Sequence, residues 1–217
     1  VGIDERIAAI RALVYAGIDA SRLIPGTGLS NVADTARLSR ACLDMGCAAV
    51  MTLPPFYYKG VSEDGLYRYF VALLEAIGAD ARIFLYHIPP VAIVGIPVSL
   101  ARRLYAEFPD NFVGIKDSSG DWDNTRALFD IDGMIVYPGS EIPLIEALEC
   151  GGHGCISATA NLNARAIADV IRLYDDGDKD AARALHDGVV RFRKIVEGHG
   201  PIPAQKRLLA VSTGESR

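Results

Sequence analysis

Amphipathic and wholly apolar segments alternate along most of the chain. From Asp4 to about Ala16, apolar residues such as Ile7 and Ile10 recur every three or four positions, and Gly17 then ends the pattern, as expected for a helix. Short segments that are almost entirely apolar lie between such helices and have the composition of strands buried on both faces. This alternation indicates parallel strands joined by helical crossovers.

Six apolar segments are predicted to be strands: Leu23–Pro25, Cys47–Leu53, Ile83–Ile88, Phe112–Lys116, Met134–Tyr137 and Gly154–Ser157. Four of the predicted helices between them open at residues that suit a helix cap or first turn: Asn31, Ser62, Pro97 and Asp121. A further helix is predicted over Glu141–Cys150. The remainder is predicted to be helical, over Ala164–Tyr174, Asp180 to about Glu197, and beyond Pro203. We therefore expect an α/β part over residues 1–160 and a helical part over residues 161–217.

Polar and aromatic residues gather where the predicted strands end. They include Thr27, Thr52, Tyr86, Lys116, Ser140, Glu141 and Ser157. Neither a G-x-G-x-x-G string nor a P-loop follows any strand, which removes the common nucleotide-binding motifs. Six parallel strands fit a doubly wound sheet or part of an eight-stranded barrel, and the pattern alone leaves both open. In barrels, active sites are built at the carboxyl ends of the strands.

Composition and charge exclude several classes of protein. The 217 residues are 50% hydrophobic and 23% charged, as in an ordinary globular protein. No apolar run reaches the ~18 residues that a membrane-spanning helix needs, and we predict neither a membrane partner nor a secretory leader. A formal net charge of −5 makes nucleic acid an improbable partner. We expect a cytoplasmic protein.

The four cysteines form two C-x4-C pairs, Cys42 with Cys47 and Cys150 with Cys155. Each pair spans a predicted helix end and the strand that follows, where cysteine acts as a small buried apolar residue. His153 lies between the second pair and leaves a zinc site open, but three nearby ligands fall short of the four that closed zinc sites use. We predict no metal.

Lys116 and Tyr86 are the candidates for chemistry. Lys116 ends an apolar strand, so its amine lies beside the core, where the neutral, nucleophilic form is favoured. Alternatively, this lysine points to solvent or pairs with Asp117 or Glu141. Tyr86 lies on the preceding strand and could exchange protons with a substrate bound to the lysine, or it is a core tyrosine.

Five strings in order carry a resemblance to a known family: Pro55–Tyr58 (PFYY), Leu85–Pro89 (LYHIP), Gly114–Gly120 (GIKDSSG), Gly151–Ser157 (GGHGCIS) and Pro201–Pro203 (PIP). Together they resemble the dihydrodipicolinate synthase / N-acetylneuraminate lyase family. The resemblance implies a (β/α)8 TIM barrel, here with six strands of eight, so that residues 1–160 form a partial barrel. It also implies a homo-oligomer, a dimer or tetramer.

The same resemblance implies a Schiff-base enzyme that needs no metal or organic cofactor. Lys116 matches the lysine that condenses with a 2-oxo acid, usually pyruvate. Tyr86 matches the tyrosine that moves protons, and Tyr58 matches a tyrosine that reaches a neighbouring subunit's site. Three further residues match positions that line the pocket: Gly139, Glu141 and Ile156.

The chain departs from the family pattern in length. The family's first two strand units, with a Gly-Thr-Thr-Gly-Glu motif, have no counterpart before Val1, and the last helices look cut short after Arg217. The similar string Ser212–Glu215 follows helical sequence and is read as coincidence. Because six strands cannot close an eight-stranded barrel, we expect this chain alone to be inactive or unstable.

The chain also departs from the pattern in one residue that bears on the substrate. The synthases of the family hold a second carboxylate with a basic residue where this chain has Val91. This favours a lyase or aldolase that acts on a 2-oxo acid, including dehydration of a sugar acid. A synthase of lysine biosynthesis in which Arg22 or Lys59 holds that carboxylate stays open, as does a non-catalytic barrel that binds a small acid.

Overall fold

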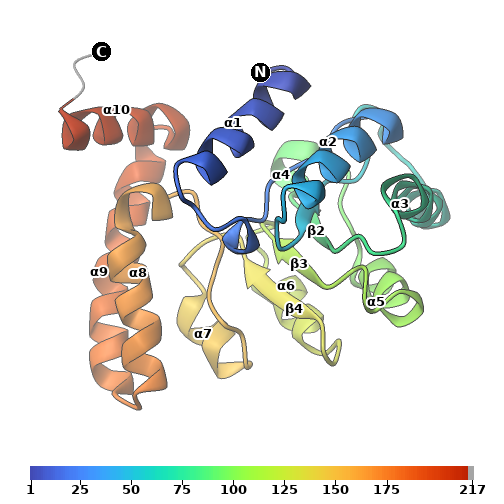
Figure 1. Cartoon of the computed structure of the whole chain (residues 1–217). Coiled ribbons are helices and arrows are strands. Elements are labelled where there is room, and N and C mark those ends of the chain that lie inside the picture. Colours follow the sequence, from blue (N-terminus) through green and yellow to red (C-terminus); the bar gives the residue numbers. More distant parts are fainter. Residues whose placement is uncertain (215–217) are drawn as a thin grey trace. The chain divides into compact units, whose positions relative to one another are not determined.

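The computed structural model describes residues 1–214, which contain one parallel sheet and a series of helices (Figure 1). Its strands lie in the order β1-β2-β3-β4. They are β1 (Val50–Thr52), β2 (Ile83–His87), β3 (Gly114–Asp117) and β4 (Ile135–Pro138). The chain divides into two compact units, Val1–Val136 and the residues from Tyr137 onward. The predicted division at residue 160 stays a prediction.

The helices of the first unit are α1 (Ile3–Tyr15), η1 (Ala20–Arg22), α2 (Val32–Asp44), α3 (Glu63–Ile77), α4 (Pro89–Ala92), α5 (Val98–Glu107) and α6 (Trp122–Phe129). Three of the predicted caps are confirmed. The side chains of Asn31, Ser62 and Asp121 each accept a hydrogen bond from a backbone N–H in the first turn that follows. Such caps satisfy N–H groups that have no partner within the helix. Local sequence therefore sets where these helices begin.

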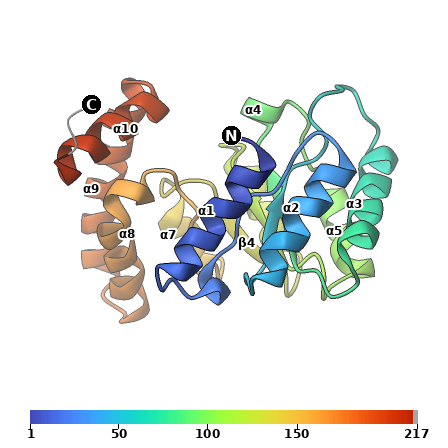
Figure 2. The same cartoon turned by 45° about the horizontal axis from the view of Figure 1, so that its top comes forward.

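The core of the first unit lies between the sheet and its helices. Leu85 and Ile115, which pair in register on β2 and β3, face this core and are fully buried. Phe70 of α3 and Leu100 of α5 meet them from the helix layer. Figure 2 shows α1, α2 and α3 side by side along the unit, each in contact with the next. Alternate strand residues point away from this core, toward the other face of the sheet.

The prediction of six strands is wrong in number, because four segments form strands within residues 1–214. Leu23–Pro25 runs beside β1, where the Leu23 and Pro25 carbonyl oxygens accept from Ala48 N and Met51 N, and an isolated bridge joins Met51 to Gly26, the residue after this segment. Gly154–Ser157 is tied to β4 by a backbone bond from Ile156 N to Pro138 O at 3.0 Å. Both segments therefore approach the sheet but make too few ladder bonds to count as strands.

The second unit is mainly helical, with α7 (Leu144–Glu149), α8 (Ala160–Asp175), α9 (Lys179–Gly198) and α10 (Pro201–Thr213). Helices α8 and α9 pack side by side (Figure 1). The helix predicted from Glu141 begins later, at Leu144, and the one predicted from Ala164 begins earlier, with a kink at Asn163.

Ser212 and Thr213 belong to α10, whereas Glu215 and Arg217 lie outside the described residues. No helix within residues 1–214 is both long and apolar enough to cross a bilayer.

The cysteines differ in burial. Cys42 and Cys47 are buried, while Cys150 and Cys155 are half-buried. Burial raises the pKa of Cys42 to about 11, with a smaller contribution from nearby Cys47, whose own pKa burial also raises. Among the described residues, no group of three or more His, Cys, Asp or Glu side chains could hold a metal ion.

This difference predicts selective alkylation. At pH 8, about one Cys42 thiol in a thousand is ionised in the folded chain, so iodoacetamide should label Cys42 about 100-fold more slowly in the folded chain than in the unfolded chain. Mass spectrometry of peptides from the folded chain measures the four rates, and the urea-unfolded chain, in which all four should react alike, is the control. Equal rates at Cys42 in the folded and the unfolded chain would contradict the burial assignment.

Candidate active site

Lys116 and Tyr86 meet at the carboxyl ends of β3 and β2. Parallel pairing places the two residues opposite each other. The Lys116 Nζ donates a hydrogen bond to the Tyr86 Oη at 3.0 Å and lies 4.2 Å from the centre of the tyrosine ring. Both residues are half-buried. The structure therefore brings together an amine and a phenol that can exchange a proton, as expected for neighbouring strands.

Asp117 does not pair with Lys116 but points to the opposite face of β3. Its carboxylate is buried and accepts hydrogen bonds from Ser119 N at 2.8 Å, Asn124 Nδ2 at 2.9 Å and Thr125 Oγ1 at 2.7 Å. These bonds attach the loop after β3 to the start of α6. Asp117 thus holds the segment that follows the lysine.

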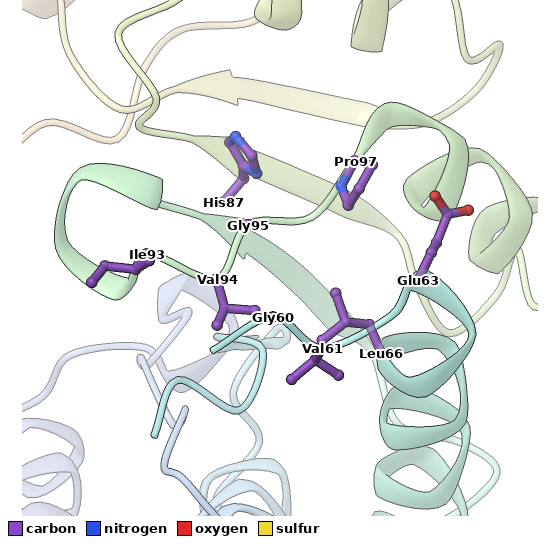
Figure 3. A pocket seen from close by; sticks show the side chains of 9 residues that line it. All are labelled: Gly60, Val61, Glu63, Leu66, His87, Ile93, Val94, Gly95 and Pro97. Atoms are coloured by element: carbon purple, nitrogen blue, oxygen red, sulfur yellow. The ribbon is translucent and has the colours of Figure 1, made fainter. Parts of the chain in front are cut away.

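His87 lies behind Tyr86, on the helix side of β2. Its Nδ1 accepts the Ile96 N–H at 2.8 Å, so the neutral ring carries its proton on Nε2. Burial lowers the pKa of His87, and the charge of Asp117 opposes this in part. His87 also lines a cavity of about 300 Å³, together with Leu66 of α3 and Val94 (Figure 3). Its lining includes neither Lys116 nor Tyr86.

His87 predicts a pH dependence of stability. Because its pKa is lower in the folded chain than its ordinary value of 6.5, the unfolded chain binds more protons, and stability falls as the pH drops below 6.5 toward the folded pKa. His87→Asn should reduce this loss, and His153→Asn, at an exposed position, should not. Thermal unfolding between pH 5 and pH 8 measures the effect. Identical profiles for His87→Asn and the wild-type chain would show that His87 does not cause it.

Tyr58 lies on the surface of the loop after β1. Tyr57 is 73% and Tyr58 is 76% exposed, and their rings meet edge to face at 5.2 Å. Lys59, in the same loop, donates to the carbonyl oxygens of Phe56 and Ala92. Its ammonium therefore joins this loop to α4. These two hydrogen bonds compete with a role for the Lys59 ammonium in holding a substrate carboxylate.

Glu141 is the centre of a polar cluster in the second unit. Its carboxylate is fully buried and accepts hydrogen bonds from Ser157, Thr159 and Arg193. Of the other two residues predicted to line the pocket, Gly139 lies between β4 and Glu141, and Ile156 directly precedes Ser157.

Sequence reasoning missed Arg193, although a signal existed. Arg193 falls at helical spacing between Val189 and Val196, which are both buried, so it interrupts the apolar face of α9. A charged residue on such a face needs a buried partner. Glu141 is that partner, at 3.2 Å.

The sequence matches the model of the Dihydrodipicolinate synthetase family over residues 1–209. It is 37% identical over 213 residues to an uncharacterized DapA-like lyase of Chloroflexus aurantiacus, covering 96% of this chain and 69% of the relative. It is 32% identical over 186 residues to the 4-hydroxy-tetrahydrodipicolinate synthase of Listeria innocua, covering 84% of this chain and 62% of the relative. The chain thus spans about two thirds of the length of these relatives.

Solved structures of similar proteins match the same part of the chain. Dihydrodipicolinate synthase from Agrobacterium tumefaciens superposes with a TM-score of 0.74 at 38% identity, over 77% of this chain and 59% of that one. The 2-keto 3-deoxygluconate aldolase from Picrophilus torridus gives a TM-score of 0.87 at 22% identity, over 99% and 76%, which is evidence for the fold alone. The predicted α/β fold of the TIM-barrel class is confirmed. The family match over residues 1–209 and the similarity to these relatives show that the chain belongs to the dihydrodipicolinate synthetase family.

Proposed function

We propose that this protein is a Schiff-base-forming lyase or aldolase that acts on pyruvate or another 2-oxo acid. The contact between the Lys116 amine and the Tyr86 hydroxyl at 3.0 Å is the observation that supports it most. A nucleophilic amine needs a group beside it that accepts and returns protons. Family membership supports the same chemistry.

In the proposed reaction, the neutral Lys116 amine attacks the C2 carbonyl of the 2-oxo acid. The C2 hydroxyl that results takes up a proton from solvent and leaves as water, which gives a protonated imine. The imine withdraws the electron pair of a bond at the neighbouring carbon. That carbon then loses a proton or a carbon substituent and becomes an enamine. Tyr86 carries the proton between this carbon and solvent water. The steps balance without a metal or organic cofactor, and the proposal includes none.

The remaining site residues and the assembly form part of this proposal. We assign Gly139, Glu141 and Ile156 to the part of the protein that receives the substrate, and Tyr58 to a site completed by a second subunit. The exposed rings of Tyr57 and Tyr58 support such a contact. We propose a cytoplasmic homo-oligomer, either a dimer or a tetramer.

A second candidate is 4-hydroxy-tetrahydrodipicolinate synthase, the name of the Listeria innocua relative. Two observations favour an aldolase instead. Val91 is exposed and uncharged where the synthases have a basic residue, and the Lys59 ammonium is already bonded to two carbonyl oxygens. Condensation of aspartate semialdehyde with pyruvate would favour the synthase, whereas cleavage of a sugar-derived 2-oxo acid would favour the aldolase.

Sodium borohydride trapping tests the proposal directly. Hydride reduces the imine carbon, so the adduct becomes a stable amine that carries one reduced pyruvyl group. With pyruvate we expect this mass increase, located at Lys116 by peptide mass spectrometry. Its formation by the 217-residue chain would also overturn the expectation that this chain alone is inactive. Pyruvate binding without an adduct would favour a non-catalytic barrel. An adduct at another lysine would refute the assignment of Lys116.

A further inference from the structure

The Glu141 carboxylate has no surface in contact with solvent. A buried carboxylate is stable only where an opposite charge and hydrogen bonds replace water. Here Thr159 Oγ1 donates to Oε1, while Ser157 Oγ at 2.5 Å and Arg193 Nη1 at 3.2 Å donate to Oε2. Both carboxylate oxygens are therefore engaged by the protein itself. This use of the carboxylate competes with direct contact to a substrate.

Arg193 links this carboxylate to α9. Its side chain is only 15% exposed. The Nη1 atom donates both to Glu141 and, at 2.9 Å, to Ser157 Oγ, while Nε and Nη2 bind Glu197 one turn later at 2.9 Å and 2.8 Å. The planar guanidinium can hold several acceptors in a set geometry, which a lysine cannot. His186, also on α9, contacts the Glu141 carbonyl oxygen at 2.8 Å.

The hydrogen bonds around Glu141 join two chain segments, and each segment contains a residue that we assign to the part of the protein that receives the substrate. Gly139 lies two residues before Glu141, and Ile156 directly precedes Ser157. The two segments meet where Ile156 N donates to Pro138 O at 3.0 Å. Fixing Glu141 and Ser157 on one guanidinium therefore fixes the spacing between the two segments.

We propose that Arg193 and Glu141 are positioning residues, which set the substrate-receiving segments 138–141 and 156–159 through a buried ion pair. This inference rests on the proposed function for its consequence in catalysis. The ion pair determines the affinity of the protein for the 2-oxo acid. The proton transfer performed by Tyr86 does not depend on it.

The test compares Arg193→Met with Arg183→Met. Arg183 lies on the same helix and pairs with Glu149 at 2.7 Å, but both side chains are about half exposed, so this variant is a matched control. In Arg193→Met we expect the Ile156 amide to exchange with deuterium about 10-fold faster, because the uncompensated Glu141 charge loosens both segments. The pyruvate concentration that gives half-maximal borohydride adduct should rise about 10-fold, while the adduct yield at saturation stays the same. Arg183→Met should change neither quantity.

The two readouts separate this inference from the proposed function. If the wild-type chain forms no adduct, the proposed function fails, and amide exchange alone decides the positioning role. Unchanged exchange in Arg193→Met, or equal changes in both variants, would overturn the inference. Should Arg193→Met not fold, the double variant Arg193→Met/Glu141→Leu removes both charges. Wild-type exchange and wild-type pyruvate affinity in that variant would overturn it as well.

Discussion

Lys116→Ala is expected to abolish the pyruvate adduct and to lower any lyase turnover by at least about 10⁴-fold, because no other group replaces the amine that forms the imine. The Tyr86→Phe variant is expected to keep adduct formation and to lose proton transfer. It should exchange the methyl protons of pyruvate with solvent about 10²- to 10⁴-fold more slowly than the wild-type chain. The reason is that the Tyr86 hydroxyl, 3.0 Å from the Lys116 amine, is the group assigned to carry that proton.

Mass spectrometry after borohydride treatment measures the adduct, and proton NMR in heavy water measures methyl exchange. Lys179→Ala is the control, because Lys179 also lies over a tyrosine ring, 4.8 Å from the centre of Tyr174, but on the surface of the second unit. It should leave both quantities unchanged. Exchange at the wild-type rate in Tyr86→Phe would exclude Tyr86 as the proton carrier.

Gly114→Ala is expected to be the most destabilising small substitution near the site. A Cβ at Gly114 would lie 2.4 Å from Phe84 Cε1 and 2.6 Å from the Ile135 carbonyl oxygen. Phe84 pairs with Gly114 in register, so its ring fills the space that a side chain would need. Relief requires the backbone of β3 or β4 to move, at a cost of about 3 kcal/mol, or about 6 °C or more in Tm. Lys116, two residues along β3, would move with it.

Thermal unfolding measures this effect, and Gly26→Ala is the matched control. Gly26 also lies beside the sheet, but an added Cβ there meets nothing within 4 Å. Its Tm should stay within about 1 °C of the wild-type value. A Gly114→Ala chain with unchanged Tm and full pyruvate adduct would contradict the packing argument for this glycine.

Local signals in the sequence predicted much of the first unit. The caps at Asn31, Ser62 and Asp121 mark helix starts because each satisfies backbone groups only two or three residues away. The strand count was wrong for the opposite reason. Whether Leu23–Pro25 or Gly154–Ser157 is a strand depends on ladder bonds to a distant segment, and an apolar pattern carries no information about how many such bonds form.

The candidate site also has one part that the sequence predicts and one part that it does not. Lys116 and Tyr86 could be placed side by side in advance, because successive parallel strands end at one edge of a sheet. The partners of Glu141 could not. Arg193 is 52 residues away, on a helix whose rotation about its axis is set by packing.

The sequence by itself therefore determined the alternation of strands and helices, the helix starts at Asn31, Ser62 and Asp121, and the lysine and tyrosine at the strand ends. These follow from the period of apolar residues and from contacts within a turn. Only the tertiary structure decided which segments become strands, that the ring of Phe84 excludes a side chain at Gly114, and that Glu141 is enclosed by Arg193. These outcomes depend on contacts between distant segments, whose geometry is set by packing of the whole unit and is not encoded in any local pattern.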